Sequence, residues 1–262
     1  MLDIETTPKA MIPHYCEFPD MKVKTHSPYG LPIVDNCVNC KLRNSNFFCS
    51  LAPDAMKALN QIKHVSSFPE GAMVFLEGQS ARGVYILCQG RVKLMTANSE
   101  GKTLILKIAE PGQILGLQSV VSGKAHELTV ETLQPSQLAF IAREDLLAFL
   151  KQYGEACLHA AQHLSRDCQS AYDLIRSIGL SHSVSERLAR LVLQLSGAVL
   201  ENGEEPKVKV ALTHEEIAQL IGASRETVTR TLGDFKKHKL MEFKGATLII
   251  RDRVALETMA AV

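Results

Sequence analysis

The stretch that most constrains this chain is residues 213 to 235, THEEIAQLIGASRETVTRTLGDF. Thr213 and Glu216 have the T-x-x-E spacing of a capping box, which predicts that a helix begins at Thr213. Apolar residues at spacings of three and four follow and give this helix one face to bury. Gly222 predicts its end, because glycine accepts the left-handed conformation of a helix C-cap, and Ser224 can cap a second helix. The stretch therefore predicts two helices joined by a tight turn.

The second of these helices has two chemically different faces, since about 100° separates successive residues. One face is apolar and can pack, through Val228, Leu232 and Phe235. The other face carries two guanidinium groups, a carboxylate and a hydroxyl, on Arg225, Glu226, Thr229 and Arg230. A helical hairpin with a solvated charged face is the alternative. The compact glycine turn and the polar groups at the helix start favour a helix-turn-helix, in which these residues contact base edges. Arginine can contact guanine O6 and N7, and glutamate can accept a hydrogen bond from cytosine N4.

Length and charge support a two-domain protein with a local basic surface. The chain has 262 residues, enough for about two domains, and 46% of them are hydrophobic, which is ordinary for a folded protein. The formal net charge is only +1, but residues 225 to 244 carry six Lys or Arg against three Asp or Glu. Lys236 and Lys237 in this segment are expected to contact DNA phosphates.

Several function classes are disfavoured. No phosphate-binding loop, nucleophile elbow or pair of catalytic carboxylates occurs, so an enzyme is not expected. His159 and His163 are four residues apart, a spacing that can hold a metal, but a position on the helix surface explains them more simply. The chain begins without a signal-peptide pattern and has no run of about 18 apolar residues, so a cytoplasmic protein is expected. Seven cysteines in that reducing compartment do not suggest a disulfide framework.

The first half of the chain divides by composition. Residues 1 to 50 hold four of the seven cysteines and five prolines without a helical or strand period, which predicts an irregular extension. Residues 54 to 65 predict a short amphipathic helix. Five short runs bounded by glycine then predict a β-sandwich or barrel over residues 51 to 142. These runs are MVFLEG, VYILCQG, RVKLMTA, TLILKIA and LTVETL.

The second half changes period. Residues 143 to 180 predict a long helix with a heptad seam that pairs with its copy across a two-fold axis; a helix packed on its own domain is the alternative. The seam positions are Cys157, Ala161, Leu164, Cys168, Ala171, Ile175 and Ile178. Residues 181 to 262 predict an amphipathic helix at 185 to 196, the helix-turn-helix, and a hairpin that turns at Lys244-Gly245. That combination is a winged helix-turn-helix.

The stretch EEIAQLIGASRETVTRTL resembles the recognition motif of the CRP/FNR superfamily of bacterial transcription regulators. FLEGQSARGVYILCQGRVKL and KIAEPGQILGLQSVVSG resemble the cyclic-nucleotide-binding jelly roll of the same superfamily. The resemblance covers residues 51 to 262 and implies an α+β protein, with a jelly roll, a dimerisation helix and a winged helix-turn-helix. It also implies a homodimer whose recognition helices enter successive major grooves about 34 Å apart on a palindromic operator.

The resemblance assigns roles on the second helix. The base-reading positions of the CRP-like subset are matched by Arg225, Glu226 and Arg230, which implies a TGTGA-like half-site with two guanine contacts. The FNR-like subset lacks the arginine at position 225. Thr229 shares this face. Phosphate contacts are expected from three hydroxyls that also serve as caps or helix-start groups, those of Thr213, Ser224 and Thr227.

The ligand cassette of the cyclic-AMP-binding relatives is altered. Those relatives have Gly-Glu-Leu and later Arg-Ser, whereas this chain has Gly116-Leu117-Gln118 and Lys124-Ala125-His126-Glu127. The ribose-binding carboxylate is replaced by Leu117, and the phosphate-binding arginine by His126. Glu127 stands in place of the serine and would repel a phosphate. Cyclic AMP is therefore not the expected ligand, although a nucleotide-responsive regulator, with Lys124 supplying charge, stays an alternative.

Loss of that cassette is typical of the FNR branch, whose members often carry a cysteine-ligated, oxygen-sensing iron-sulfur cluster. Cys37-Val-Asn-Cys40 followed by Cys49 resembles the N-terminal cysteine group of that branch. Thiolates close in sequence can ligate one metal or cluster. Two features depart from the branch: the gap before Cys49 is eight residues, and Ala139 occupies the region of the fourth ligand.

The fourth ligand is therefore open, with Cys88 as the first candidate and Cys16 as the alternative. Three interpretations compete for these cysteines: an iron-sulfur cluster, a zinc or thiol redox site, and cysteines without a metal. Cys88 lies within a predicted strand, where a small core residue is the simplest interpretation.

Together these patterns predict a sequence-specific DNA-binding transcription regulator that responds to oxygen, redox state or another signal than cyclic AMP. RNA polymerase is an expected partner. The alternative is a signalling protein that keeps the roll and acts through protein partners.

Overall fold

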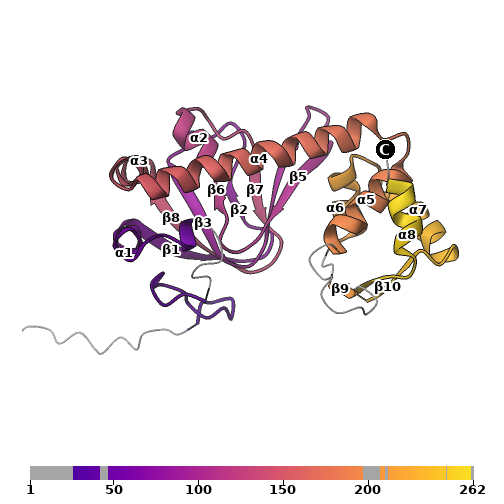
Figure 1. The fold of residues 1–262 in the computed structure, drawn as a ribbon, viewed down its shortest axis with the longest axis horizontal. Helices are drawn as coiled ribbons and strands as arrows, with labels where there is room; N and C mark the ends of the chain where they lie inside the picture. Colours follow the sequence, from indigo (N-terminus) through magenta and orange to yellow (C-terminus); the bar gives the residue numbers. More distant parts are fainter. Residues whose placement is uncertain (1–25, 42–46, 197–206, 210–211, 246, 261–262) are drawn as a thin grey trace, which may run out of the picture.

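The computed structural model describes residues 26–41, 47–196, 207–209, 212–245 and 247–260. The alternative ligand Cys16 lies outside these residues. Two domains are connected by the long helix α4 (Gly154–Leu180), which runs along the N-terminal domain and ends beside the C-terminal one (Figure 1). The predicted α+β class is confirmed. None of the described helices combines the length and the apolar character that a bilayer span requires.

The N-terminal domain is a roll of two four-stranded antiparallel sheets, ordered β1-β8-β3-β6 and β2-β7-β4-β5. Its strands are β1 (Lys63–Phe68), β2 (Met73–Phe75), β3 (Gly83–Gln89), β4 (Val92–Ala97), β5 (Thr103–Ala109), β6 (Ile114–Leu115), β7 (Thr129–Thr132) and β8 (Ser136–Ala142). The five glycine-bounded runs are confirmed as β2, β3, β4, β5 and β7. Strands β1, β6 and β8 were not predicted, although β8 joins β1 to β3 at the centre of the first sheet.

The predicted helix at 54 to 65 is wrong at its end. Helix α1 (Pro53–Ile62) stops at Ile62, and Lys63 is extended because it pairs with Ile141 of β8. The spacing of apolar residues within this segment could not reveal the pairing, because the partner strand lies almost eighty residues further along the chain.

Two apolar clusters stabilise the roll. One fills the space between the two sheets and includes Leu87, Val92, Val130 and Leu138. The other lies between the first sheet and the elements that cover it: the short 3₁₀ turn η1 (Phe47–Cys49), α1, α2 (Leu117–Ser122), α3 (Arg143–Gln152) and the start of α4. Cys88 belongs to this second cluster, so its predicted burial in the core is confirmed.

The single helix predicted over 143 to 180 is two helices. The chain is extended at Tyr153, which separates α3 from α4. Along α4 the inward face is formed by Ala156, Ala160 and His163, which are buried. Four of the predicted seam positions are exposed, namely Cys157, Ala161, Cys168 and Ile175, whereas Leu164, Ala171 and Ile178 are half-buried. Leu158 and Tyr172 add to the exposed apolar side, and dimerisation through it stays a prediction.

The C-terminal domain has its own core around α5 (Val184–Ser196), α6 (His214–Ile221), α7 (Arg225–Lys237) and α8 (Arg253–Ala260). The predicted hairpin is confirmed as β10 (Met241–Lys244) and β11 (Thr247–Ile250). Two elements were not predicted: α8, and β9 (Lys207–Lys209), which pairs with β11 as a third strand.

Candidate functional site

The turn between α6 and α7 has the geometry that its sequence predicts. The hydroxyl of Thr213 accepts a hydrogen bond from the Glu216 amide at 3.1 Å, and the Glu216 carboxylate accepts one from the Thr213 amide at 2.8 Å. Helix α6 ends at Gly222 with a φ of 62°. Ser224 then caps α7 by accepting from the Thr227 amide at 3.2 Å. These bonds fix the direction in which α7 leaves the turn.

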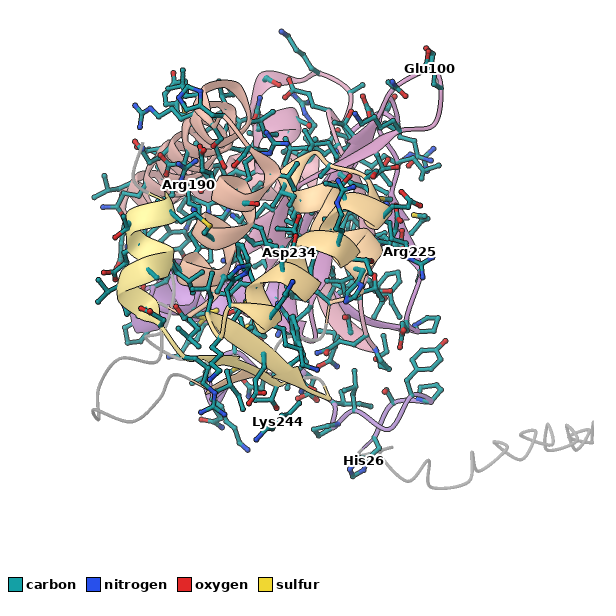
Figure 2. All side chains as sticks on the ribbon, turned by 90° about the vertical axis from the view of Figure 1, so that its right-hand side faces the viewer. His26, Glu100, Arg190, Arg225, Asp234 and Lys244 are labelled. Atoms are coloured by element: carbon teal, nitrogen blue, oxygen red, sulfur yellow. The ribbon has the colours of Figure 1, made fainter. Side chains whose placement is uncertain are left out.

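Helix α7 is divided into a buried and an exposed side as predicted. Val228, Leu232 and Phe235 are buried in the domain core, and the exposed side carries Arg225, Glu226, Thr229 and Arg230. Figure 2 looks at this end of the molecule, with Arg225 and Asp234 on α7 and Lys244 on the hairpin. Hydrogen bonds from its own backbone amide and from the Ser224 hydroxyl lower the pKa of Glu226. The carboxylate is therefore ionised near neutral pH, as a hydrogen-bond acceptor for a base edge must be.

The hydroxyls of the turn already have partners within the domain. Ser224 and Thr227 lie 3.0 Å apart through their hydroxyl oxygens, and the Thr213 hydroxyl donates to Glu216 at 3.0 Å. The Thr229 hydroxyl lies 3.0 Å from Nδ1 of His214 on α6. These groups hold the two helices together, so any contact with phosphate adds to a structural role.

The basic residues beyond α7 fall into two groups. Lys236 and Lys237 are exposed on the last turn of the helix. On the hairpin, the Glu242 carboxylate accepts from Arg251 at 2.6 Å and lies 3.7 Å from the Lys244 ammonium. Glu242 thus neutralises part of the positive charge of the wing, and the lysines of α7 are left as the stronger phosphate candidates.

The residues that replace the nucleotide cassette line a small cavity of about 70 Å³. Leu117 is buried at the start of α2, and the buried imidazole of His126 stacks on Phe75 with the ring centroids 3.9 Å apart. Burial lowers the pKa of His126, so the ring is neutral near pH 7. The Glu127 carboxylate accepts a hydrogen bond from Gln118 at 2.7 Å. These four residues place no cation where a phosphate-binding arginine would be needed.

A polar cluster that includes two residues of the cavity wall, Lys107 and Asp167, attaches α4 to the roll. The Lys107 ammonium of β5 contacts the Asp167 carboxylate at 2.7 Å. Nε2 of His163 lies 2.8 Å from the Ile114 carbonyl oxygen and 3.4 Å from Asp167. The surface position predicted for His163 is therefore wrong, because its ring is 5% exposed. Burial lowers the pKa of His163, which favours the neutral ring donating from Nε2 to the carbonyl.

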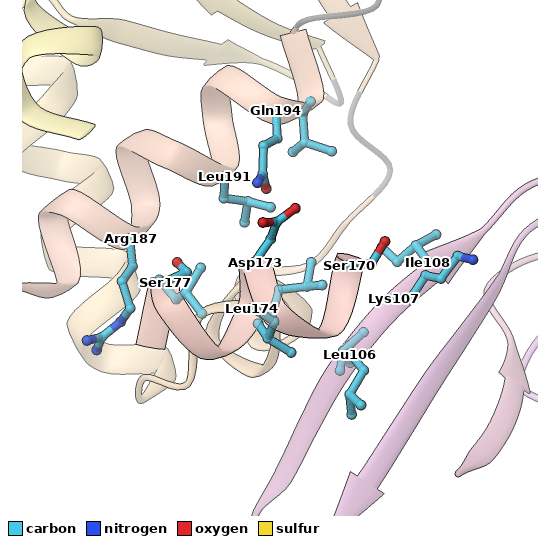
Figure 3. Close-up of a pocket in the computed structure, with 14 residues that line it drawn as sticks. Leu106, Lys107, Ile108, Ser170, Asp173, Leu174, Ser177, Arg187, Leu191 and Gln194 are labelled. Carbon is cyan, nitrogen blue, oxygen red and sulfur yellow. The ribbon is translucent and has the colours of Figure 1, made fainter. Parts of the chain in front are cut away.

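The two domains meet where α4, β5, α5 and α6 converge. A pocket of about 340 Å³ lies there, with Leu106 and Ile108 of β5 on one side and Leu191 and Gln194 of α5 on the other (Figure 3). Beside it, the Lys93 ammonium of β4 lies 3.0 Å from Glu131 and 3.9 Å from Glu216. Because Glu216 also forms the capping box of α6, this ion pair links the roll directly to the helix-turn-helix.

The predicted cysteine ligands come together in the N-terminal domain. Cys37, Cys40, Cys49 and Cys88 line one cavity of about 20 Å³, together with Lys63. Cys88 on β3 is 9% exposed, and burial is the main cause that raises the pKa of its thiol to about 12. The charge of Lys63 acts in the opposite direction, whereas the other three cysteines raise this pKa further. All four sulfurs are therefore close enough to interact electrostatically.

The cysteine segment is attached to the roll at both ends. The Cys37 amide donates to the Asn60 side chain of α1 at 3.0 Å. Beyond Cys49, which ends η1, the Ala52 amide donates to the Glu155 carboxylate at the start of α4 at 3.1 Å. Within the described ranges, no three His, Cys, Asp or Glu side chains are close enough together to hold a single metal ion. Cys157 and Cys168 are exposed on α4.

Several residues at these sites were missed by sequence reasoning. Lys63 and Asn60 were placed in the amphipathic helix predicted over residues 54 to 65 without a role, and Lys107 and Asp167 carried no motif. Their only sequence signal is weak: Lys63 begins KHVSSF, the run that forms β1, in which only Val65 and Phe68 are apolar. Which strand faces it, and therefore what surrounds it, depends on pairing over a long distance in the chain.

Two family models match the chain. The model of the cyclic nucleotide-binding domain matches residues 65–153, and the model of the Crp-like helix-turn-helix domain matches residues 186–259. The "CRP-like cAMP-activated global transcriptional regulator" of Mycobacterium tuberculosis is 30% identical over 224 residues, which cover 84% of this chain and 98% of that protein. The "Cyclic AMP receptor protein" of Thermus thermophilus is 25% identical over 219 residues, with 84% and 98% covered.

A solved structure shows the same fold. FixK2 from Bradyrhizobium japonicum superposes with a TM-score of 0.68 at 21% sequence identity, covering 77% of this chain and 98% of that one.

Proposed function

This chain belongs to the CRP/FNR superfamily of transcription regulators, as its sequence predicted, and we propose that it binds a palindromic operator with TGTGA-like half-sites. One observation carries the proposal: α7 buries one side and exposes Arg225, Glu226 and Arg230 together on the other. The two arginines are the guanine readers and the ionised glutamate is the acceptor for a cytosine amino group. Thr229 shares the side of the base readers, and Thr213, Ser224 and Thr227 at the helix starts contact the DNA phosphates.

The regulator acts as a homodimer in the cytoplasm. Support comes from α4, whose outward side exposes Leu158, Tyr172 and Ile175. Pairing of two α4 helices along this side would cover these side chains together with the exposed seam residues Cys157, Ala161 and Cys168. Pairing of two α4 helices places two copies of α7 on one face of the DNA, about 34 Å apart. RNA polymerase is the expected partner on the promoter.

The signal is not cyclic AMP, although the relatives from Mycobacterium tuberculosis and Thermus thermophilus are named as a cAMP-activated regulator and a cyclic AMP receptor. In this chain Leu117, His126 and Glu127 line the cavity at the position of that cassette, and Lys107, which also lines it, is already paired with the Asp167 carboxylate at 2.7 Å. An anionic phosphate needs charge-assisted donors at this point. The neutral His126 ring, stacked on Phe75, does not supply a charge.

The cysteine cavity is the sensing site, and an iron-sulfur cluster held by Cys37, Cys40, Cys49 and Cys88 is the group that fits it best. Four thiols from three separate segments surround one space, which is the donor set of such clusters. A zinc ion holds each thiolate at about 2.3 Å and so needs all four within about 4 Å of one another. Among the described residues no three such side chains are close enough together to hold a single metal ion, which counts against zinc. Since the cavity is small, loading requires the segment with Cys37 and Cys40 to shift outward.

When bound, a cluster supplies a group that is sensitive to oxygen and redox state. Two contacts connect the cavity to the dimer helix: η1, which ends at Cys49, packs against α4, and the Ala52 amide is bonded to Glu155. From α4, the Lys107–Asp167 pair and the packing of Ile178 near Gly222 continue to β5 and α6. A change in ligation at Cys49 therefore acts on the element that positions both domains.

The test is purification of the full chain under anaerobic conditions, followed by an absorption spectrum and analysis for iron, sulfide and zinc. A gel shift then compares a TGTGA palindrome with a scrambled duplex, before and after exposure to air, with and without cyclic AMP. We expect an iron-containing coloured protein whose preference for the palindrome changes with air and not with cyclic AMP. Equal binding to both duplexes would contradict the operator, and a colourless, iron-free protein would contradict the cluster.

A further inference from the structure

Lys63 is a lysine inside the apolar core of the roll. It begins β1 and is 7% exposed, although lysine is rarely buried unless it is paired. Its ammonium donates a hydrogen bond to Sγ of Cys37 at 3.0 Å. The same cavity is lined by Cys40, Cys49 and Cys88. The buried cation thus lies in the wall of the cavity that the four cysteines line, in contact with Cys37.

The remaining walls of the cavity offer this cation no other charge. They are apolar, and include Phe48, Met56, Leu59, Ile86 and Ala139. Burial of an ammonium group is costly unless a negative charge or several hydrogen bonds accompany it. Neutral thiols are weak acceptors. The free-energy cost of burying the Lys63 ammonium is therefore offset if the cavity carries negative charge in the functional protein.

We propose that Lys63 is a positioning residue that holds the Cys37 sulfur and compensates the negative charge of a thiolate-ligated cluster. The inference rests on the proposed function of the cavity. Hydrogen bonds to the ligand sulfurs, net charge and solvent exposure set the reduction potential of iron-sulfur clusters. A buried positive charge beside Cys37 stabilises the reduced, more negative state and so raises the potential.

The contacts on each side of Lys63 support a positioning role. Asn60, on the last turn of α1, accepts a hydrogen bond from the Cys37 amide at 3.0 Å. Cys37 is thus held at its backbone by α1 and at its sulfur by Lys63 of β1. Strand β1 is itself fixed, because Lys63 pairs with Ile141 of β8. The ammonium therefore approaches Cys37 from a rigid sheet and not from a surface loop.

The experiment uses the full chain, loaded anaerobically with ferrous iron and sulfide, and measures the midpoint potential of the cluster by redox titration with its absorption and paramagnetic spectra. Lys63→Met removes the charge and the donor at similar length, and Lys63→Arg keeps both. Lys57→Met is the matched control, because Lys57 lies on helix α1, just before β1, but is exposed to solvent, where its charge is screened.

We expect Lys63→Met to raise the ratio of oxidised to reduced cluster about tenfold at a fixed solution potential. This change corresponds to a fall of about 59 mV in the midpoint potential of a one-electron couple. Lys63→Arg should retain most of the wild-type potential, and Lys57→Met all of it. A folded Lys63→Met that takes up no iron while Lys63→Arg does would also support the proposal. A cluster with unchanged potential and spectra in Lys63→Met would overturn the role of Lys63 alone. An iron-free wild type would overturn the cluster as well, so the two failures are distinguishable.

Discussion

Helix α7 and the cysteine cavity differ in how their functional residues are arranged and in how far they are exposed to solvent. The four polar residues of α7 lie within six positions of one helix and are exposed. The cavity brings together four cysteines and Lys63 from positions 37 to 88, which lie on η1, the segment before it, β1 and β3. Exposed charges on α7 keep their hydration until DNA replaces it, whereas the buried groups must satisfy one another within the fold.

This difference sets the size of the effects expected from substitution. Removal of one cysteine ligand should release the whole cluster, because all four thiolates are needed to complete its coordination. A set of exposed base readers loses one contact at a time, since each side chain meets a different base edge. Three predictions test this contrast and a fourth tests the buried histidine of α4, from the largest expected effect to the smallest.

The largest effect is expected in the cavity. Cys88→Ser, which is nearly isosteric, should abolish binding of the cluster, because serine does not replace a thiolate ligand in this donor set. Iron and sulfide analysis after anaerobic loading measures the loss. Cys157→Ser is the control, since Cys157 is exposed on α4 and should leave the iron content unchanged. Full iron retention in Cys88→Ser would show that the fourth ligand lies elsewhere, with Cys16 as the next candidate.

A smaller effect is expected on α7. Arg230→Ala should weaken operator binding by about 1 to 3 kcal/mol and relax the preference at one guanine. Binding titrations on the palindrome and on duplexes changed at single positions measure both effects. Lys57→Ala, far from α7 in the chain and exposed on α1, serves as the control. An equal loss of affinity for every duplex would mean that Arg230 contacts the backbone instead of a base.

The lysines at the end of α7 should act on affinity without selecting sequence. Removal of Lys236 or Lys237 should lower the slope of log affinity against log salt by at most about one unit each, through loss of a phosphate contact. Measurements at four or more salt concentrations, on specific and scrambled duplexes, determine the slope. If the slope of the double variant equals that of the wild type, the DNA path does not pass these residues.

The smallest effect concerns pH and the attachment of α4. Burial lowers the pKa of His163, against the opposing influence of Asp167, while Lys107 and Arg166 lower it further. The unfolded chain therefore binds a proton at higher pH than the folded protein does. The stability contributed by neutral His163 is present above the usual histidine pKa of about 6.5 and is lost as pH falls from there towards the folded value.

Denaturant titrations should thus give a smaller free energy of unfolding at acidic pH than at pH 7.5. His163→Gln, which keeps a donor for the Ile114 carbonyl, should reduce this pH dependence. His126 has a pKa lowered by burial as well, so His126→Gln in parallel separates the two contributions. An identical pH dependence in wild type and His163→Gln would exclude His163 as its source.

The sequence could predict the reading helix because its signals are local. Capping by Thr213 and Ser224, the stop at Gly222 and the apolar spacing of α7 all act within a few residues. The same holds for the glycine-bounded strands and for the wing. The spacing of apolar residues gave the wrong prediction at two places. At Tyr153 it predicted one continuous helix where the structure has two, and at Lys63 it predicted a helix where the residue pairs with β8 in a sheet.

What the sequence by itself determined was the family, the helix-turn-helix and the identity of the residues on its exposed face, because these depend on caps, turns and periodicity along a short stretch. Only the tertiary structure decided that Cys88 meets Cys37, Cys40 and Cys49, that Lys63 is buried among them, and that His163 is enclosed beneath α4. Those outcomes depend on which strands pair and which helices cover them. Such contacts join residues far apart in the chain, and their free energies come from shared burial that no local pattern encodes.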